Sequence, residues 1–533
     1  MRLLLSGCFA VLSFVVFTLV VDEVDADIEL PKLFSDHMVL QQNQSMRING
    51  TADKQEELTV KFKDQEFEVV ADGNGKWSAI ISTGRAGGPF QLEVASRNSE
   101  TKVVFSDVLV GEVWICAGQT NMRFPVRKSK GANEHIGAAK KFPMMRAFNV
   151  GQTASALPQK DFSDVESWFC CTPDSIKDFS AIAYLFGREL SKKLDVPIGL
   201  INVASDGTTL ESWTAYDVLK ADGGFDQLLK HWQERNEPSN PNRVSSSYNA
   251  MVAPLAGFGF RGVIWYQGES NVGRGSQYRR MFPLMIESWR KKLGQPQCPF
   301  LFVQPTPFRY EEQPVEALPE IWDAQLKTYN AVKGTGMVVT TDLGSTESNQ
   351  PDEKLPIAQR LANWAFTGCY AKNLAKEKAI RRRQENVRPV GSTDNASSGE
   401  EQAADKQENK RDETLASFHR STNIVPSGPI YKSAKTVDNQ IVIQFNMAGG
   451  GLFLSTGLEH GFTICGEDRK FLVAQVTVSG DQLMVGHDEI RKPIAVRYGW
   501  TDTAEATLRN SAGLPASPFR TDEFPLISDG VEF

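Results

Sequence analysis

Residues 111–126, GEVWICAGQTNMRFPV, combine a short apolar strand with a polar loop. The apolar run 113–116 predicts a strand that is buried on both faces. Ala117 and Gly118 end this run, and the polar triplet 119–121 follows directly. A buried strand that stops at a glycine and presents a hydroxyl group is how α/β enzymes expose a nucleophile at the carboxyl edge of a parallel sheet. The same residues also fit a strand that ends in an ordinary turn, and this stretch alone leaves both interpretations open.

Around this stretch, predicted strands and helices alternate from residue 109 to 371. Apolar stripes predict helices over 180–194 and 277–293. The alternation predicts an α/β domain whose parallel sheet is covered on both faces. Loops that follow parallel strands gather at one edge of the sheet and form one crevice there. The further predicted strands cover 198–203, 262–266, 300–303 and 337–341, and the loops that would form the crevice begin at 117, 204, 267, 304 and 342.

Both flanks of this domain predict antiparallel β structure. Residues 27–108 alternate apolar and polar side chains between glycine-rich turns, which predicts a small β-sandwich-like domain. We expect His37 in this region to be a structural side chain. Residues 423–533 return to the same alternation. Between them, residues 372–422 are highly charged and contain almost no large apolar side chains, which predicts a disordered or solvated insertion that serves as a surface linker.

The composition limits the classes of function. With 533 residues, the chain is long enough for roughly two to four domains. A net charge of -7 argues against a nucleic-acid partner, because binding a polyanion requires a basic face. The six His residues are scattered without metal-ligand spacing, so we predict no metal site and no cofactor. Cysteines are too few for a disulfide framework.

The amino terminus has the pattern of a secretory signal peptide. Met1 and Arg2 precede an apolar run over 3–21, and Val24-Asp25-Ala26 is a small-residue cleavage pattern. We predict that residues 1–26 are removed, that the mature chain is secreted or periplasmic, and that it has no stable membrane insertion after cleavage. An uncleaved membrane anchor is the alternative.

Five blocks of sequence, in order, resemble the sialate O-acetylesterase family, a branch of the SGNH hydrolases. The resemblance implies an SGNH-type, flavodoxin-like parallel-sheet domain flanked by N- and C-terminal antiparallel β regions. It also implies hydrolysis of an acetyl ester on sialic acid or another sugar, with an acetylated sugar or glycan as the partner. The blocks are FSDHMVLQQ, GEVWICAGQTNM, VPIGLINVASDGTTLESW, YNAMVAPL followed by RGVIWYQGESN, and VRYGWTDTAE with GLPASPFRTD.

The resemblance also places the family's catalytic triad, and all three positions differ here. The nucleophile is the Ser of a GQSNM block, where this chain has Thr120. In a later block similar to D-I-H-P-x-x-K, the positions of the acid and the His correspond to Ser348 and Gln350. The β-branched Thr restricts χ1 and crowds the attack, and a carboxamide has no titratable nitrogen to act as a general base. We therefore predict that catalysis is lost or very weak.

The resemblance assigns further residues to the site. It implies oxyanion donors at Gly207, Gln267 and Asn271, and substrate contacts at Gln119, Asn121, Trp265 and Glu269. Without the resemblance, ordinary hydrogen bonding within loops would explain these polar side chains equally well.

Three hypotheses follow for the function. The chain is an esterase in which Thr120 attacks with an unrecognised base, such as Glu269 or Asp206. Alternatively, it is a non-catalytic carbohydrate-binding pseudoenzyme, which the missing base favours. The flanking β domains also allow a purely structural cell-surface protein.

Overall fold

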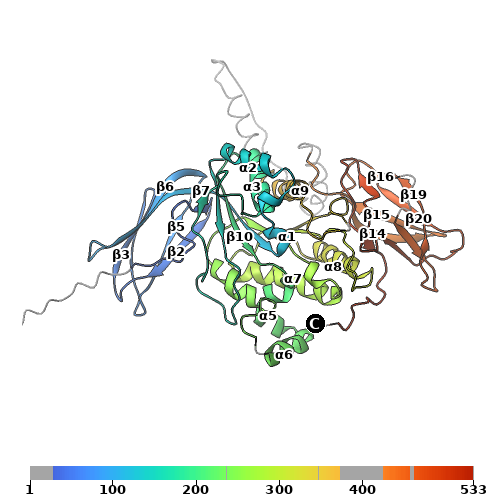
Figure 1. The fold of residues 1–533 in the computed structure, drawn as a ribbon, viewed down its shortest axis with the longest axis horizontal. Coiled ribbons are helices and arrows are strands. Elements are labelled where there is room, and N and C mark those ends of the chain that lie inside the picture. The colour runs from blue at the N-terminus through green and yellow to red at the C-terminus, as the bar shows by residue number, and fades with distance from the viewer. Residues whose placement is uncertain (1–27, 236, 346, 372–423, 456–460, 532–533) are drawn as a thin grey trace, which may run out of the picture.

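The computed structural model describes residues 28–371 and 424–531, apart from residues 236, 346 and 456–460 (Figure 1). The predicted signal peptide and the predicted insertion lie outside the described residues. Within the described part of the chain, no helix is long and apolar enough to cross a membrane.

A parallel sheet forms the centre of the molecule, as the alternation of strands and helices predicts. Its strand order is β13-β12-β11-β7-β10-β8, every neighbouring pair is parallel, and the short β9 is antiparallel at the edge next to β8. The strands are β7 (Lys102–Gly118), β8 (Met145–Asn149), β9 (Phe169–Cys170), β10 (Ile198–Ala204), β11 (Gly262–Tyr266), β12 (Phe300–Val303) and β13 (Thr335–Val338).

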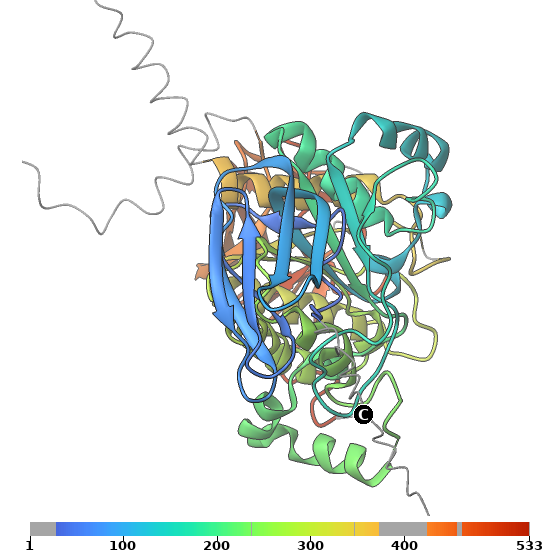
Figure 2. The ribbon, with the colours of Figure 1, turned by 90° about the vertical axis from the view of Figure 1, so that its left-hand side faces the viewer.

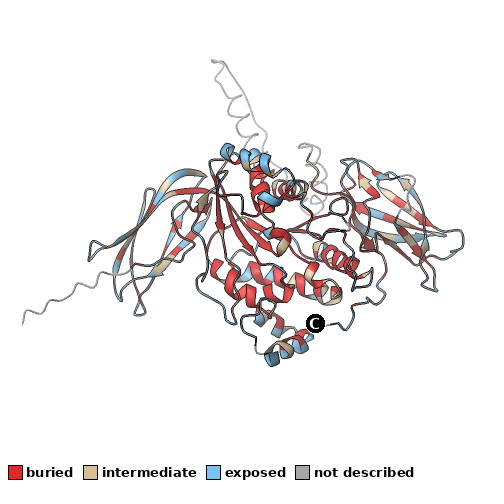
Figure 3. Ribbon diagram, in the orientation of Figure 1, coloured by how far each residue is buried: buried red, intermediate tan, exposed pale blue. Residues whose placement is uncertain are grey.

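Helices cover this sheet, and their apolar sides bury it. Helices α3 and α9 pack against each other, as do α7 and α8, and the two pairs lie on opposite sides of the sheet (Figure 1). Figure 3 shows that the buried residues concentrate in the sheet strands and on the helix sides that face them. In the described part of the chain, the α-helices longer than four residues are α2 (Ala132–Ala138), α3 (Ala181–Leu194), α5 (Tyr216–Ala221), α6 (Asp226–Arg235), α7 (Gly275–Lys292), α8 (Ala317–Ala331) and α9 (Leu355–Ala365).

Strand β7 is shared by two sheets. Its first part pairs with the antiparallel strand β6 (Gly87–Ser96), and its second part pairs with β10 and β11 in the parallel sheet. Burial follows this change: side chains from Lys102 to Asp107 are exposed or half-buried, and every residue from Val108 to Gly118 is buried. The strand therefore runs without interruption through the boundary that the sequence places between residues 108 and 109.

The flanking regions are antiparallel, as expected, except that the short strand β1 (Val39–Gln41) pairs in parallel with β7. Figure 2 shows the amino-terminal strands, in blue, side by side. This region contains β1 (Val39–Gln41), β2 (Ser45–Thr51), β3 (Glu57–Phe62), β4 (Gln65–Val70) and β5 (Lys76–Ser82). The carboxyl-terminal region contains β14 (Ile430–Val437), β15 (Gln440–Asn446), β16 (Leu452–Leu454), β17 (Phe462–Cys465), β18 (Leu472–Val473), β19 (Gln475–Ser479), β20 (Gln482–Gly486), β21 (Ala495–Tyr498), β22 (Leu508–Asn510) and β23 (Phe519–Arg520).

His37 forms an ion pair in the amino-terminal region. Its Nδ1 lies 2.8 Å from Asp107 Oδ2, and Arg146 Nη2 lies 2.8 Å from the same oxygen. Cys170 Sγ lies 3.9 Å from His37 Nδ1, so three potential metal ligands meet here. Since the arginine already compensates the carboxylate charge, a metal ion would have to compete with a bound cation. The arrangement fits the structural role expected for His37.

Candidate active site

Thr120 begins the short helix α1 (Thr120–Arg123) at the carboxyl end of β7. Gly118 makes the sharp exit from the strand possible. Its φ is 143°, and a Cβ there would lie 2.2 Å from the carbonyl oxygen of Tyr266 on the neighbouring strand. The same carbonyl accepts a 3.0 Å hydrogen bond from the Gln119 N–H. The local geometry therefore places the Thr120 hydroxyl at the edge of the sheet where the crevice is expected.

Gly207 reaches this hydroxyl from the loop after β10. Its N–H donates to Thr120 Oγ1 at 3.2 Å, and its φ of 65° lies in the left-handed region. A backbone N–H beside a nucleophile is the kind of donor that stabilises a developing oxyanion. The structure thus brings together the predicted nucleophile position and one predicted oxyanion donor.

The other two predicted oxyanion donors, Gln267 and Asn271, are engaged elsewhere. Gln267 Nε2 donates to Thr208 O at 3.2 Å and to Asn271 Oδ1 at 2.7 Å. Asn271 Oδ1 also accepts from the Leu210 N–H, and its Nδ2 donates to Glu211 Oε2. Both side chains are buried. Their amides brace the segment after Gly207, and their role as oxyanion donors stays a prediction.

Glu269 is the centre of a buried polar cluster beneath Thr120. Its carboxylate accepts hydrogen bonds from Gln119 Nε2 and Asn121 Nδ2. Asn121 Oδ1 accepts from Lys354 Nζ at 2.6 Å. Gln119 and Asn121 therefore hold the carboxylate below the surface, and Glu269 also lines a cavity.

Burial controls the protonation of this cluster. Desolvation raises the pKa of Glu269 above its usual value. Desolvation lowers the pKa of Lys354 to about 7, although the charges of Glu269 and Asp352 oppose that shift. The sequence places Lys354 in the D-I-H-P-x-x-K-like block but gives it no role. The only feature of the sequence that could have indicated a role for Lys354 is its position in that block, three residues after Pro351.

Trp265 does not line the crevice. It is fully buried, and its ring packs edge-to-face against Trp213 and Trp289, with centroids 5.6 and 5.8 Å away. It belongs to the aromatic core beside α7, because side chains alternate between the two faces of a strand and Trp265 points toward the helix. The prediction of a substrate contact at Trp265 is corrected accordingly.

The substituted acid and base positions lie on an exposed loop next to the site. Asn349 O accepts from Asn121 Nδ2 at 2.8 Å, which ties this loop to the Thr120 block. The flanking Ser348 and Gln350 are exposed, and the Gln350 N–H donates to Ser348 Oγ at 3.1 Å. The loop therefore reaches the site, as the alignment of blocks predicts, but it brings a hydroxyl and a carboxamide in place of an acid and an imidazole.

The four His residues in the described part of the chain have other surroundings. His37 pairs with Asp107, and His135 Nδ1 lies 3.2 Å from Arg188 Nη1. His231 lies against the ring of Trp232, and His487 accepts from the N–H of Glu489. None of these positions places an imidazole on the loops around Thr120.

Asp206, one of the two alternative bases, is already paired. Its Oδ2 lies 2.8 Å from Arg123 Nη1, and both side chains are nearly half exposed. The charges of Arg123 and Asp206 therefore compensate each other. The carboxylate of Asp206 is therefore already bound to a cation and is not directed at Thr120 by any hydrogen bond within the described part of the chain.

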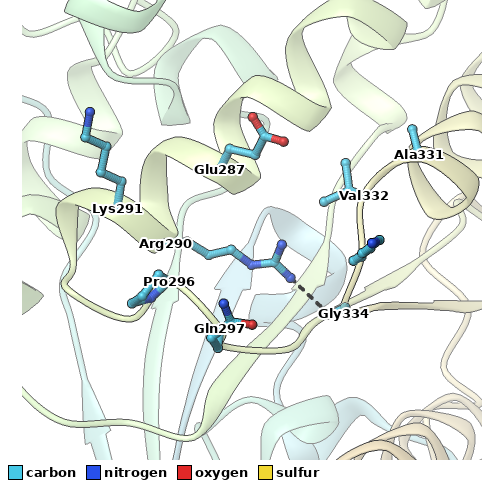
Figure 4. Close-up of a pocket in the computed structure, with 9 residues that line it drawn as sticks. Glu287, Arg290, Lys291, Pro296, Gln297, Ala331, Val332 and Gly334 are labelled. Carbon is cyan, nitrogen blue, oxygen red and sulfur yellow. Dashed lines mark hydrogen bonds between the residues drawn. The ribbon is translucent and has the colours of Figure 1, made fainter. Parts of the chain in front are cut away.

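Two cavities lie at opposite edges of the sheet. One, of about 980 Å³, is lined by Glu269 and by the loop from Phe308 to Gln313, on the Thr120 side. The other, of about 720 Å³, lies where β12 and β13 begin, and Figure 4 shows Arg290 in it, donating to the carbonyl of Gly334. Since ligands of open α/β sheets bind at the carboxyl ends of the strands, the first cavity extends the candidate site.

Comparison with known proteins gives two kinds of similarity. Residues 110–365 match the sequence model of a family described as carbohydrate esterase, sialic acid-specific acetylesterase. Sialate O-acetylesterase from Homo sapiens is 31% identical over 329 residues, which cover 56% of this chain and 62% of that protein. The Mus musculus protein is 30% identical over 356 residues, covering 57% and 65%. The chain thus spans less than two thirds of the length of these relatives.

A solved structure is similar over nearly the whole chain. The crystal structure of a carbohydrate acetylesterase from Xanthomonas citri matches with a TM-score of 0.76 and 29% sequence identity. The match covers 93% of this chain and 100% of that one. It therefore includes the flanking β regions as well as the parallel sheet.

Proposed function

Because this chain belongs to the carbohydrate esterase family of sialic acid-specific acetylesterases, we propose that its crevice binds an acetylated sugar and hydrolyses the acetyl ester weakly or not at all. The observation that carries this proposal is the surroundings of Thr120. Its hydroxyl has the Gly207 N–H at 3.2 Å, while the loop that should bring a base brings Gln350. Acyl transfer needs a group that takes the proton of the attacking hydroxyl, and a carboxamide cannot take it.

What remains of the site suits binding more than turnover. The oxyanion donor and the cavity beside Glu269 are present, and these parts need no titratable base. In serine hydrolases the oxyanion hole and binding alone leave a residual acceleration of about 10³–10⁴ over water. Residual turnover of that order is therefore compatible with a protein whose main property is carbohydrate binding.

A second candidate is an active esterase that uses Thr120 with a different base. It is favoured by Lys354, because a lysine whose pKa is about 7 is partly neutral at physiological pH. Lys354 is bonded to Asn121, however, and is fully buried beneath the cluster. Within the described part of the chain, no hydrogen bond joins Lys354 to the Thr120 hydroxyl.

Turnover measurements separate these two candidates. Wild type, Thr120→Ala and the restored variant Thr120→Ser/Ser348→Asp/Gln350→His would be assayed on an activated acetyl ester and on an acetylated sialic acid. We expect wild type to match Thr120→Ala and the restored variant to exceed both by about 10²-fold or more, the usual contribution of a general base. Wild-type turnover that disappears in Thr120→Ala would overturn the proposal in favour of the active esterase.

We further propose that the mature chain is secreted or periplasmic, on the basis of the apolar run 3–21 and the small residues 24–26. Expression of the full chain followed by sequencing of its amino terminus tests this. Cleavage after Ala26 is expected. An intact amino terminus in the membrane fraction would favour the anchor instead.

A further inference from the structure

We propose that the cavity beside Glu269 selects an uncharged acetylated sugar and disfavours an anionic one such as sialic acid. The inference rests on the proposed function, since it assumes that an acetylated sugar binds in this crevice. It departs from the substrate in the name of the curated relatives, and its basis is the charge that lines the cavity.

The cavity and the candidate active site share Glu269. Glu269 belongs to its lining, and the same carboxylate is held by Gln119 and Asn121 on either side of Thr120. The volume of about 980 Å³ is at the upper end of the usual range for small-molecule sites and accommodates a sugar. In this proposal the acetyl group lies at Thr120 and the sugar ring extends toward this cavity.

Four carboxylates line the cavity. Glu311, Glu312 and Glu347 are exposed side chains of the lining, and they form no ion pair within the described part of the chain. Glu269 is the buried member of the four, and desolvation raises its pKa. A concave surface lined by one sign of charge focuses the field and repels ligands of the same sign.

Among the described residues, the lining of the cavity has one cation against four carboxylates. This cation is Arg309, whose side chain is 56% exposed and whose Nη2 lies 4.0 Å from the buried carboxylate of Asp502, beyond hydrogen-bond distance. Arg123 pairs with Asp206, and Lys354 is fully buried against Asn121. A sugar carboxylate is best recognised by the two-pronged face of an arginine, and the three exposed carboxylates of the lining outnumber the one arginine that could supply it.

The rest of the lining suits a neutral sugar. The rings of Phe308 and Tyr310 are perpendicular, with centroids 5.0 Å apart, and give the cavity an apolar wall. Gln313 and Thr503 add an amide and a hydroxyl group. Apolar contact with a sugar ring face, combined with a few polar groups that bind its hydroxyls, is the usual way in which a pocket orients such a ligand. The carboxylates act here as acceptors for those hydroxyls.

Two ligands that differ only in the charge of the sugar carboxylate, together with a neutral sugar, test this inference. Their binding to full-length Thr120→Ala, which does not consume the ester, would be measured by titration calorimetry. The ligands are the methyl glycoside of an O-acetylated sialic acid, the methyl ester of its carboxylate, and an O-acetylated neutral pyranoside. We expect the methyl ester to bind about tenfold or more tightly than the acid, and the difference to shrink as salt is added.

The outcomes distinguish this inference from the proposed function. If the acid binds as tightly as its methyl ester, or more tightly, the selectivity proposed here is wrong and sugar binding stands. If none of the three ligands binds, both proposals fail.

A charge-neutralising variant then locates the effect. Glu311→Gln/Glu312→Gln/Glu347→Gln, made in the Thr120→Ala chain, is expected to remove most of the difference between acid and ester. The matched control is Glu57→Gln/Glu66→Gln/Glu68→Gln, which removes three exposed charges from β3 and β4 and should keep the difference. If the cavity variant keeps it too, these carboxylates do not set the selectivity and the inference is overturned.

Discussion

Asn121 uses its whole side-chain amide to join three segments beside Thr120. Its Nδ2 donates to Glu269 and to the carbonyl of Asn349, and its Oδ1 accepts from Lys354. The cluster is buried, so each of its polar groups depends on the others for a partner. Consequently, the Thr120 block is fixed by contacts with residues about 150 and 230 positions further along the chain.

Replacing Lys354 by methionine tests this dependence. Lys354→Met fills the same space but leaves the Glu269 carboxylate buried without a nearby cation. We expect a loss of about 3–5 kcal/mol in the free energy of unfolding, measured with urea. The double variant Lys354→Met/Glu269→Gln should recover part of that loss, because it no longer buries an unpaired charge. If the double variant is less stable than Lys354→Met, the two groups are not coupled as described.

The same lysine predicts a dependence on pH. The pKa of Lys354 is lowered to about 7 in the folded chain from 10.5, so between these values the unfolded chain binds more protons. The contribution of Lys354 to stability therefore rises with pH from about 7 to about 10, by at most about 1.4 kcal/mol per unit. We expect wild type to gain stability relative to Lys354→Met when urea unfolding is compared at pH 7 and pH 9. A difference that stays constant or shrinks would contradict the lowered pKa.

For single residues, the sequence predicts which loop a side chain belongs to better than it predicts which partner that side chain binds. The approach of Gly207 to Thr120 agrees with the resemblance of their blocks to a known site. The engagement of Gln267 and the core position of Trp265 could not be predicted, because both depend on partners from other segments. Polar residues in a strand-end loop have the same local pattern whether they face a ligand or support a neighbouring loop.

Among the helices and strands, the end of β7 depends most strongly on one residue type, a glycine at position 118. A Cβ at Gly118 would lie 2.2 Å from the Tyr266 carbonyl, which also accepts the hydrogen bond that starts the Thr120 loop. We expect Gly118→Ala to cost about 1–3 kcal/mol or more, because the backbone conformation is also unfavourable for a side chain. Thermal unfolding of the purified variant measures this loss.

Gly137 provides the matched control. It lies on the surface of α2, and a Cβ there meets no atom within 4 Å. Gly137→Ala should therefore stabilise the chain slightly, by about 0.5–1 kcal/mol, through the gain in helix propensity. Equal effects of the two substitutions would show that close approach at Gly118 does not constrain this turn.

Strands that are buried along their whole length were easier to predict than a strand whose burial changes along its length. Strands β11 and β12 have the predicted bounds, because each is a continuous apolar run between polar loops. Strand β7 was predicted only in part. Its pattern changes from half-exposed to fully buried near Val108, and a sequence pattern that changes in this way predicts two elements where the chain forms one.

For the whole molecule, the shared strand joins two sheets at Glu112. This residue is 1% exposed, and its carboxylate accepts from Gln42, Arg261 and Tyr370. The three donors come from the amino-terminal region, the segment before β11 and the segment after α9. The two sheets are therefore joined both by the continuous backbone of β7 and by the hydrogen bonds of Glu112. For this reason we expect them to unfold together.

Glu112→Gln tests this coupling of the two sheets. The substitution keeps the size of the side chain but leaves the guanidinium of Arg261 without its anion. We expect the free energy of unfolding to fall by about 3 kcal/mol. This is the low end for a broken buried ion pair, because Arg261 is 31% exposed. Calorimetry should show one transition at a lower temperature, with matching calorimetric and van 't Hoff enthalpies.

As a control, Glu66→Gln, which removes an exposed partner of Lys61, should change the free energy of unfolding by less than about 0.5 kcal/mol. If Glu112→Gln instead separates an early transition of the amino-terminal strands from the main one, the sheets are independent units. If the single transition moves as a whole, β7 and Glu112 make the amino-terminal sheet part of the same cooperative unit as the sheet that carries Thr120.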